Sequence, residues 1–245
     1  MSPLSRIAAA GVAAAALTGA GLAHATSAEA DNRLYAIGDS WAAGYRADPL
    51  HALIQDAADD LDMSAVVDGE SGSGYLTAPN GTRTYPQRAA AIPAGTTADL
   101  VIIQGGSNDD GADLTALPAA VEATVAGVRR ALPHAAIVLL GPGPDPWPVT
   151  GVQRQVDRIL VAEGRRMHVR VISPLQEGWF TAGNVDDVID PVTAHPTVEG
   201  DAVLGADLAA DLRTDRHGPG RGDVTRSTLP AHRSIRSRRR AASLR

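Results

Sequence analysis

Three polar side chains in this sequence are of the types that carry out acyl transfer at a carbonyl carbon. Ser40 ends the run Ile37-Gly38-Asp39-Ser40, Asn108 lies in Gly105-Gly106-Ser107-Asn108-Asp109, and His195 stands directly before a proline. A serine hydroxyl is a weak nucleophile until an adjacent base accepts its proton, and histidine is the commonest such base. Ser40 is therefore a candidate nucleophile, and His195 is one of seven histidines that could be its general base.

Donors for the negative charge that would develop on the substrate oxygen are also present. The Asn108 amide is one candidate, and such a donor contributes roughly 3 kcal/mol in the transition state. Gly72, in the Gly-rich segment 69–74, is a second candidate through its backbone N–H, with Gly74 as its main competitor. The Ser40 N–H, expected near a helix start, is the third. The predicted oxyanion hole is thus Ser40, Gly72 and Asn108, and Asp39 is expected to brace the turn by accepting backbone hydrogen bonds.

Apolar strands and amphipathic helices alternate along the chain and predict how these residues are positioned. Right-handed crossovers between such strands build an open parallel sheet between helix layers, and ligands bind outside the carboxyl ends of its strands. Ser40, Gly72 and Asn108 follow the first three strands in turn, so we expect them at one rim. The predicted fold is α/β, a three-layer α/β/α sandwich with a parallel sheet of about five strands. The strands are predicted at 33–40, 64–67, 99–103, 135–140 and 169–172, and the helices at 49–61, 114–132, 151–167 and 197–212.

The order of these blocks resembles the SGNH (GDSL-type) hydrolase family, named for its Ser, Gly, Asn and His. The blocks are Ile37-Gly38-Asp39-Ser40, Ser71-Gly72, Gly105-Gly106-Ser107-Asn108-Asp109 and His195-Pro196, with Gly200 five residues after the histidine. The resemblance covers roughly residues 33–213 and implies a flavodoxin-like fold and a serine esterase. It also implies that His195, of the seven histidines, is the general base that takes the proton of Ser40. The Gly-x-Ser-x-Gly elbow of ordinary α/β-hydrolases does not occur in the sequence.

The third member of a catalytic triad is where the sequence departs from this family. The family usually has Asp three residues before the histidine, a position that Val192 holds here. Asp190, five residues before His195, is the nearest candidate, and Asp186 and Asp187 are weaker ones. Two interpretations remain open: Asp190 orients His195 from a longer loop, or a backbone carbonyl orients it in a Ser–His dyad.

Both ends of the chain are expected to lie outside the catalytic domain, which is predicted to span residues 31–213. Residues 1–25 read as a signal peptide, with an Ala-rich apolar run and cleavage at Ala23-His24-Ala25 or as late as residue 30. An uncleaved anchor is the alternative. The chain has no Cys and so no disulfide. Residues 214–245 read as a disordered tail.

The net charge of −6 combines an acidic body with a basic tail. The tail from Thr214 holds nine Arg and two acidic residues (+7), so the other 213 residues hold 13 Arg and 26 acidic residues (−13). An Arg-rich tail is expected either to contact the anionic cell envelope, at about 1 kcal/mol per Arg, or to be merely solvated. Export argues against a nucleic-acid partner. The Ala-rich, Lys-free composition indicates a high-GC genome, and the chain is identified as similar to secreted actinobacterial members of the family.

We therefore predict a monomeric, secreted or envelope-associated serine esterase (a GDSL-type esterase or lipase) acting on a small-molecule, glycan or lipid ester. No cofactor is expected, and no metal site either, since Asp109, Asp110 and Asp113 match no ordered calcium loop. Two alternatives remain. The same residues could transfer the acyl group to an alcohol, or the chain could be a non-catalytic module that binds the envelope.

Overall fold

A sheet of five parallel strands forms the centre of the fold, in the spatial order β2-β1-β3-β4-β5. In this computed structural model the described residues are 32–45, 49–79, 81–145 and 147–214. The parallel sheet and its flanking helices confirm the predicted α/β class. The strands are β1 (Arg33–Gly38), β2 (Ser64–Gly69), β3 (Leu100–Gln104), β4 (Ala136–Leu140) and β5 (Arg170–Ile172).

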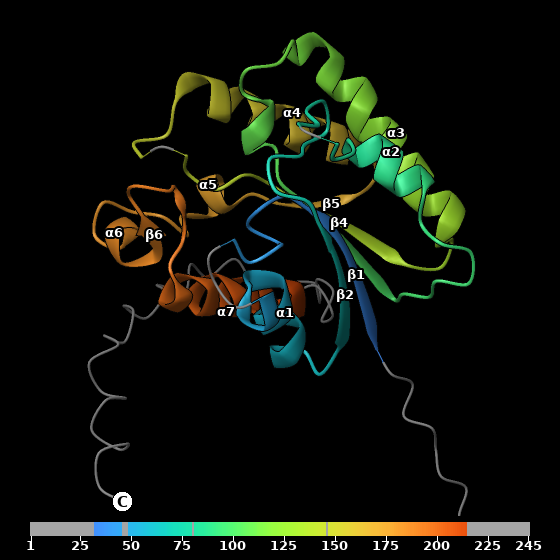
Figure 1. Cartoon of the computed structure of the whole chain (residues 1–245), viewed down its shortest axis with the longest axis horizontal. Helices are drawn as coiled ribbons and strands as arrows, with labels where there is room; N and C mark the ends of the chain where they lie inside the picture. Colours follow the sequence, from blue (N-terminus) through green and yellow to red (C-terminus); the bar gives the residue numbers. More distant parts are fainter. Residues whose placement is uncertain (1–31, 46–48, 80, 146, 215–245) are drawn as a thin grey trace, which may run out of the picture. The chain divides into compact units, whose positions relative to one another are not determined.

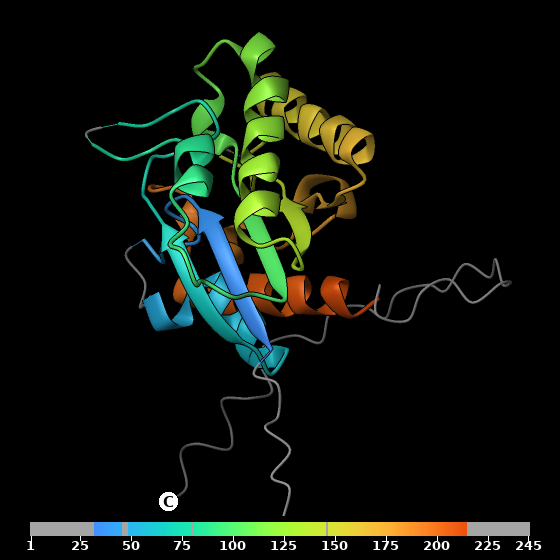
Figure 2. The ribbon, with the colours of Figure 1, turned by 90° about the vertical axis from the view of Figure 1, so that its right-hand side faces the viewer.

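Helices cover both faces of this sheet (Figure 1). α1 (Leu53–Asp60) and α7 (Val198–Thr214) pack together on one face, and α2 (Tyr85–Ala90), α3 (Leu117–Ala131) and α4 (Gly151–Met167) cover the other. Figure 2, turned by 90°, shows α3 running along the sheet with α7 on the opposite side. The result is the three-layer sandwich that the sequence predicts.

Each strand contributes side chains to two separate hydrophobic cores, because successive side chains of a strand point to opposite faces. In β1, Leu34 and Ala36 pack toward α1 and α7, whereas Tyr35 and Ile37 pack toward α2, α3 and α4. A strand buried on both faces reads as a continuous apolar run, which is why β1 and β3 are the clearest signals in the sequence.

Short elements complete the described chain and include the hairpin that carries His195. β6 (Ile189–Asp190) pairs antiparallel with β7 (His195–Pro196). The remaining short helices are η1 (Pro49–His51), η2 (Ser107–Asp109), η3 (Leu114–Ala116), α5 (Pro174–Glu177) and α6 (Val185–Val188).

The structure differs from the sequence expectations at three places. The chain after Ser40 forms a single hydrogen-bonded turn, in which the Tyr45 N–H donates to the Ser40 carbonyl at 2.9 Å, and no regular helix begins there. α2 was not predicted, because it has only six residues and contains Pro86. α7 continues to Thr214, two residues beyond the predicted helix, so Thr214 does not begin a tail.

The predicted signal peptide and the rest of the predicted tail, residues 215–245, lie outside the described residues. Of the helices that are described, none is both long and apolar enough to cross a bilayer.

Candidate active site

The carboxyl ends of three adjacent strands bring the predicted site residues together. β1 lies between β2 and β3, so the segments after these strands, which contain Ser40, Gly72 and Asn108, leave the same edge side by side. From β1 the chain crosses to one side to form β2 and returns to the other to form β3. This reversal is a topological switch point, where open α/β sheets bind their ligands.

Ser40 and His195 form a hydrogen-bonded pair across 155 residues of sequence. The distance between His195 Nε2 and Ser40 Oγ is 2.8 Å, within the range for a nucleophile and its general base. Ser40 is only 8% exposed, so little water competes for its hydroxyl. His195 reaches it from β7, the second strand of the small hairpin. The two predicted residues are therefore brought together.

The second ring nitrogen of His195 faces a backbone carbonyl. His195 Nδ1 lies 2.6 Å from the Thr193 carbonyl oxygen. Because a carbonyl oxygen can only accept, this contact assigns the ring proton to Nδ1 and leaves Nε2 as the acceptor. The ring is thus held in the tautomer that can take the Ser40 proton.

Asp190 braces the turn that carries this carbonyl. Its Oδ1 accepts the N–H groups of Val192 at 2.8 Å and Thr193 at 3.1 Å. Its own carbonyl oxygen accepts the Ala194 N–H at 2.8 Å, and Ala194 adopts a φ of 55° that closes the turn. The geometry favours the interpretation in which a backbone carbonyl orients His195 and Asp190 supports the turn.

The three predicted oxyanion donors lie on segments that leave the same edge of the sheet. In the described part of the chain, the N–H groups of Ser40 and Gly72 have no protein acceptor. Asn108 Nδ2 donates to the Ser73 carbonyl at 2.9 Å, which uses one of its two N–H groups and fixes the amide next to Gly72. Gly74, the competing candidate, donates its N–H to the Thr77 carbonyl at 2.8 Å and so is not available.

Asp109, next to Asn108, anchors the loop that carries Gly72. Its carboxylate accepts the N–H groups of Tyr75, Leu76 and Thr77 at 2.9, 2.9 and 3.1 Å. Burial raises the pKa of Asp109, although these hydrogen bonds act in the opposite direction. A Cβ on Gly74 would collide with this carboxylate, which explains the glycine there.

Asp39 braces the nucleophile turn, as predicted. Its Oδ1 accepts the Trp41 N–H at 2.9 Å, and its own N–H donates to Gln104 Oε1 at 3.3 Å. Burial raises the pKa of Asp39 to about 6. Two turns at neighbouring strand ends, after β1 and β3, are thus tied to each other below the site.

Aromatic side chains border the Ser–His pair. The rings of Tyr45 and His195 lie 4.4 Å apart, and Tyr45 is 40% exposed. Trp41, buried beneath, donates its Nε1–H to the Ala194 carbonyl at 3.3 Å and so ties the hairpin to the nucleophile turn.

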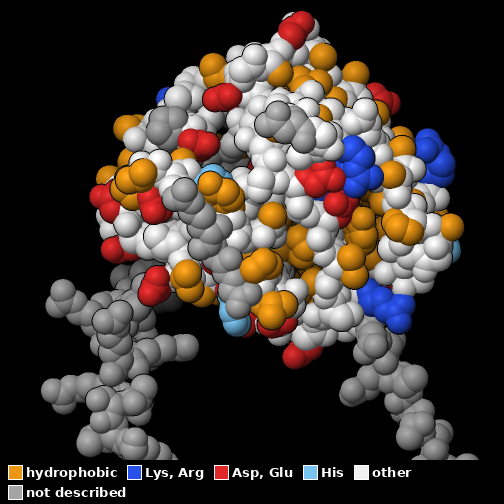
Figure 3. Space-filling view, in the orientation of Figure 1, with side chains coloured by type: hydrophobic (Ala, Val, Ile, Leu, Met, Phe, Trp, Pro, Cys, Tyr) orange, Lys and Arg blue, Asp and Glu red, His pale blue; other side chains and the backbone are white. Residues whose placement is uncertain are grey.

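The electrostatic surroundings are acidic. Burial raises the pKa of Asp145, with His195 lowering it and Asp110 raising it, so these groups are close enough to interact. Figure 3 shows more acidic than basic side chains on the face drawn. Among the residues that can be described, no three His, Asp or Glu side chains gather as a metal site.

Two contributors to the site carry no recognisable sequence signal. The Thr193 carbonyl could not be identified because any residue has one. The buried Arg88, which contacts the last residue of β1 and the segment after β2, belongs to the unpredicted α2. Asp68, in β2, and Glu70, directly after it, do not identify Arg88 as their partner in the sequence.

Comparison with known families gives a match that spans most of the domain. The model of the GDSL-like lipase/acylhydrolase family matches residues 36–203, which include all four blocks. No curated protein matches the sequence.

Solved structures with the same fold are similar at low sequence identity. A family 2 carbohydrate esterase with a carbohydrate-binding domain, from Corynascus thermopiles (Myceliophthora fergusii), has a TM-score of 0.61 at 21% identity, over 75% of this chain and 66% of that one. A putative G-D-S-L family lipolytic protein from Desulfitobacterium hafniense has a TM-score of 0.61 at 17% identity, over 73% of this chain and 98% of that one. The aryl esterase of M. smegmatis has a TM-score of 0.55 at 20% identity, over 75% of this chain and 99% of that one. At these identities the likeness establishes the fold.

Proposed function

Since this chain belongs to the GDSL-like lipase/acylhydrolase family and is thus a hydrolase that acts on esters, we propose that it cleaves carboxylic esters through an acyl-enzyme on Ser40. The observation that carries the proposal is the 2.8 Å contact between His195 Nε2 and Ser40 Oγ, with Nδ1 held by a carbonyl oxygen.

In the acylation step, Ser40 Oγ attacks the substrate carbonyl carbon while His195 Nε2 takes its proton. The carbonyl oxygen becomes an oxyanion, which the N–H groups of Ser40 and Gly72 and the second N–H of Asn108 would stabilise. Collapse of this intermediate breaks the bond to the alcohol oxygen. His195 returns the proton to the departing alcohol, and the acyl group stays on Ser40.

In the deacylation step, His195 takes a proton from water, and the resulting hydroxide attacks the acyl carbon. The same donors hold the oxyanion again, and the acid leaves as Ser40 Oγ recovers the proton. Protein groups and water account for every proton transferred and every bond formed or broken in these two steps.

We further propose that Thr193 replaces the triad acid. Its carbonyl fixes the His195 tautomer and, through its dipole, stabilises the imidazolium that forms. A carbonyl carries less negative charge than a carboxylate, so we expect a slower enzyme of the same reaction class.

The test is hydrolysis of p-nitrophenyl esters from C2 to C12 by the protein and its Ser40→Ala variant. Turnover should fall on the order of 10⁶-fold, or to background, as when a catalytic serine is removed elsewhere. Ser64→Ala is the matched control, because Ser64 is exposed at the start of β2, at the other end of the sheet. The chain-length profile would separate an acetylesterase from a lipase.

Labelling by a fluorophosphonate separates the alternatives. Labelling that disappears in Ser40→Ala indicates an activated serine, whereas absence of both labelling and turnover would favour a non-catalytic envelope-binding module. Acylated product formed when an alcohol is supplied would favour acyl transfer. Export through residues 1–25 and envelope contact through the Arg-rich tail are proposals that rest on the sequence alone.

A further inference from the structure

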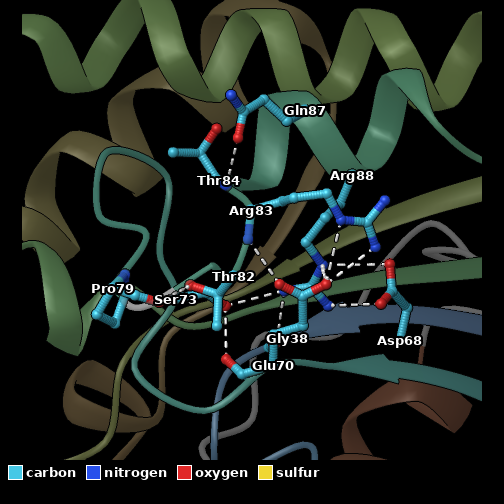
Figure 4. A network of polar contacts seen from close by, with 10 residues as sticks. All are labelled: Gly38, Asp68, Glu70, Ser73, Pro79, Thr82, Arg83, Thr84, Gln87 and Arg88. Carbon is cyan, nitrogen blue, oxygen red and sulfur yellow. Dashed lines mark hydrogen bonds and ion pairs between the residues drawn. The ribbon is translucent and has the colours of Figure 1, made fainter.

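Arg88 is a fully buried cation below the candidate active site. Its side chain has 0% exposure, and it projects from α2 toward the ends of β1 and β2 (Figure 4). Burying a charge is unfavourable unless it is paired and its hydrogen-bonding capacity is used. A buried arginine therefore has to be explained by what it contacts.

The contacts of Arg88 join two segments that both contribute to the oxyanion hole. Nη1 donates to the Gly38 carbonyl at 2.9 Å, and Gly38 ends β1 two residues before Ser40. The same nitrogen donates to Ser73 Oγ at 2.9 Å, and Ser73 directly follows Gly72. One side chain thus bonds both the strand that carries the nucleophile and the loop that carries the glycine donor.

Ser73 transmits this link to the third donor. Its carbonyl accepts Asn108 Nδ2 at 2.9 Å, and its hydroxyl donates to the Glu70 carbonyl at 2.6 Å. Moving Ser73 would displace the Gly72 N–H and the Asn108 amide together. Arg88 therefore reaches the neighbourhood of all three predicted donors through two acceptors, the Gly38 carbonyl and Ser73 Oγ.

Two carboxylates hold the guanidinium in place from its other side. Asp68 Oδ2 accepts Nε at 3.2 Å, and Asp68 Oδ1 forms an ion pair with Nη2 at 3.2 Å that is not aligned as a hydrogen bond. Glu70 lies 3.9 Å from Nε and is itself held by Arg83, at 2.9 Å. Burial raises the pKa of Glu70, but the hydrogen bonds from Arg83 lower it further, so the pKa of Glu70 falls below its usual value and the carboxylate stays charged.

We propose that Arg88 is a positioning residue that sets the Gly72 and Asn108 donors relative to Ser40. The inference rests on the esterase function proposed above. Charge pairing alone would require only a cation near Asp68, which a lysine could supply. The planar fork is needed to bond Asp68, Gly38 and Ser73 at the same time.

The decisive variants are Arg88→Lys, which keeps the charge and removes the fork, and Ser73→Ala, which removes the acceptor. For each, kcat should fall about 10-fold to 100-fold with KM within about threefold of wild type, because displaced donors act on the transition state. The double variant should be no worse than the poorer single variant, since both changes break one link. Val125→Ala is the control. It creates a cavity at the buried face of α3 and so lowers stability without changing a residue of the site.

Affinity for phenylboronic acid supplies a readout that a purely structural role would not change. Its adduct with Ser40 Oγ is a tetrahedral anion with an oxygen in the oxyanion site, so the inhibition constant should rise in parallel with the loss in kcat/KM. Val125→Ala should lower the melting temperature and leave both quantities unchanged at 25 °C.

The possible outcomes are distinct. Arg88→Lys with a lower melting temperature but wild-type kcat and boronate affinity would overturn the positioning role while Ser40-dependent turnover upheld the esterase. If the losses in kcat of the two single variants multiply in the double variant, the two residues act independently, and this would also overturn the positioning role. If neither turnover nor boronate binding by the wild-type protein depends on Ser40, the esterase function fails and this inference fails with it.

Discussion

Replacement of Asp190 by Asn separates the two ways in which His195 can be oriented. If Asp190 is a triad acid, its charge and acceptor position are essential for catalysis. If it braces the 190–194 turn, what matters is an acceptor for the Val192 and Thr193 N–H groups, at 2.8 and 3.1 Å. An asparagine oxygen can accept both hydrogen bonds, so the turn should survive.

The expected magnitudes differ by several orders. Exchange of a triad Asp for Asn lowers kcat by about 10⁴-fold in the best-characterised serine protease, because the histidine then adopts the wrong tautomer. Here the tautomer is set by the Thr193 carbonyl, at 2.6 Å from Nδ1. Hydrogen bonds to a charged acceptor contribute roughly 1 kcal/mol more than neutral ones, so Asp190→Asn should lower the free energy of unfolding by about 2 kcal/mol. We expect kcat/KM to fall by less than about tenfold.

The assay is steady-state hydrolysis of p-nitrophenyl acetate, with urea unfolding of the same samples. Asp190→Ala removes the acceptor and frees Thr193, so it should be worse than Asp190→Asn, with a loss of about 100-fold. Asp186→Asn is the control, since Asp186 is exposed on the neighbouring α6. A loss near 10⁴-fold in Asp190→Asn at unchanged stability would refute our reasoning and make Asp190 the triad acid.

Two further predictions concern the oxyanion hole and a buried carboxyl. Asn108→Ala should lower kcat about 10²-fold to 10³-fold with little change in KM, measured with the same esters; an unchanged kcat would remove Asn108 from the oxyanion hole. Asp201, whose Oδ1 accepts the Leu53 N–H at 3.1 Å, has its pKa raised by burial from 3.8 to about 7. Because the folded state binds this proton more tightly than the unfolded chain, the stability that it contributes is fully present below pH 4 and is lost as the pH rises through about 7. Asp201→Asn has no carboxyl group to ionise, so its free energy of unfolding in urea should rise relative to that of wild type when the pH is changed from 4.5 to 8.5. A difference between variant and wild type that is the same at both pH values would contradict the raised pKa of Asp201.

The strand ends were predictable because burial on both faces leaves an unmistakable pattern. The apolar run of β1 stops at Gly38 and that of β3 at Gln104, and in a parallel sheet that is enough to bring Ser40 and Asn108 to the same edge. Gly72 follows by the same argument from β2. His195 could not be placed in this way, since the hairpin that carries it has strands of two residues. Its prediction depended on the family resemblance.

The supporting interactions were not predictable, for two physical reasons. Orientation of His195 by the Thr193 carbonyl depends on backbone geometry, which the identity of residue 193 does not encode. Arg88 was missed because charged side chains are almost never fully buried unless paired, and its partner Asp68 lies 20 residues away on another element. A short helix with a proline in its first turn offers no amphipathic pattern of useful length.

The distance in sequence between Ser40 and His195 has a consequence for biosynthesis. Ser40, the proposed nucleophile, follows the first strand, and His195, the proposed base, lies 155 residues later, after the last strand of the sheet. A chain emerging from the ribosome holds its nucleophile turn long before the base has been made. The pair is complete only once the hairpin that carries His195 has docked against the turn that carries Ser40. We therefore expect a fragment that ends before residue 195 to lack the proposed activity, and we expect activity to appear only when the two ends of the domain meet.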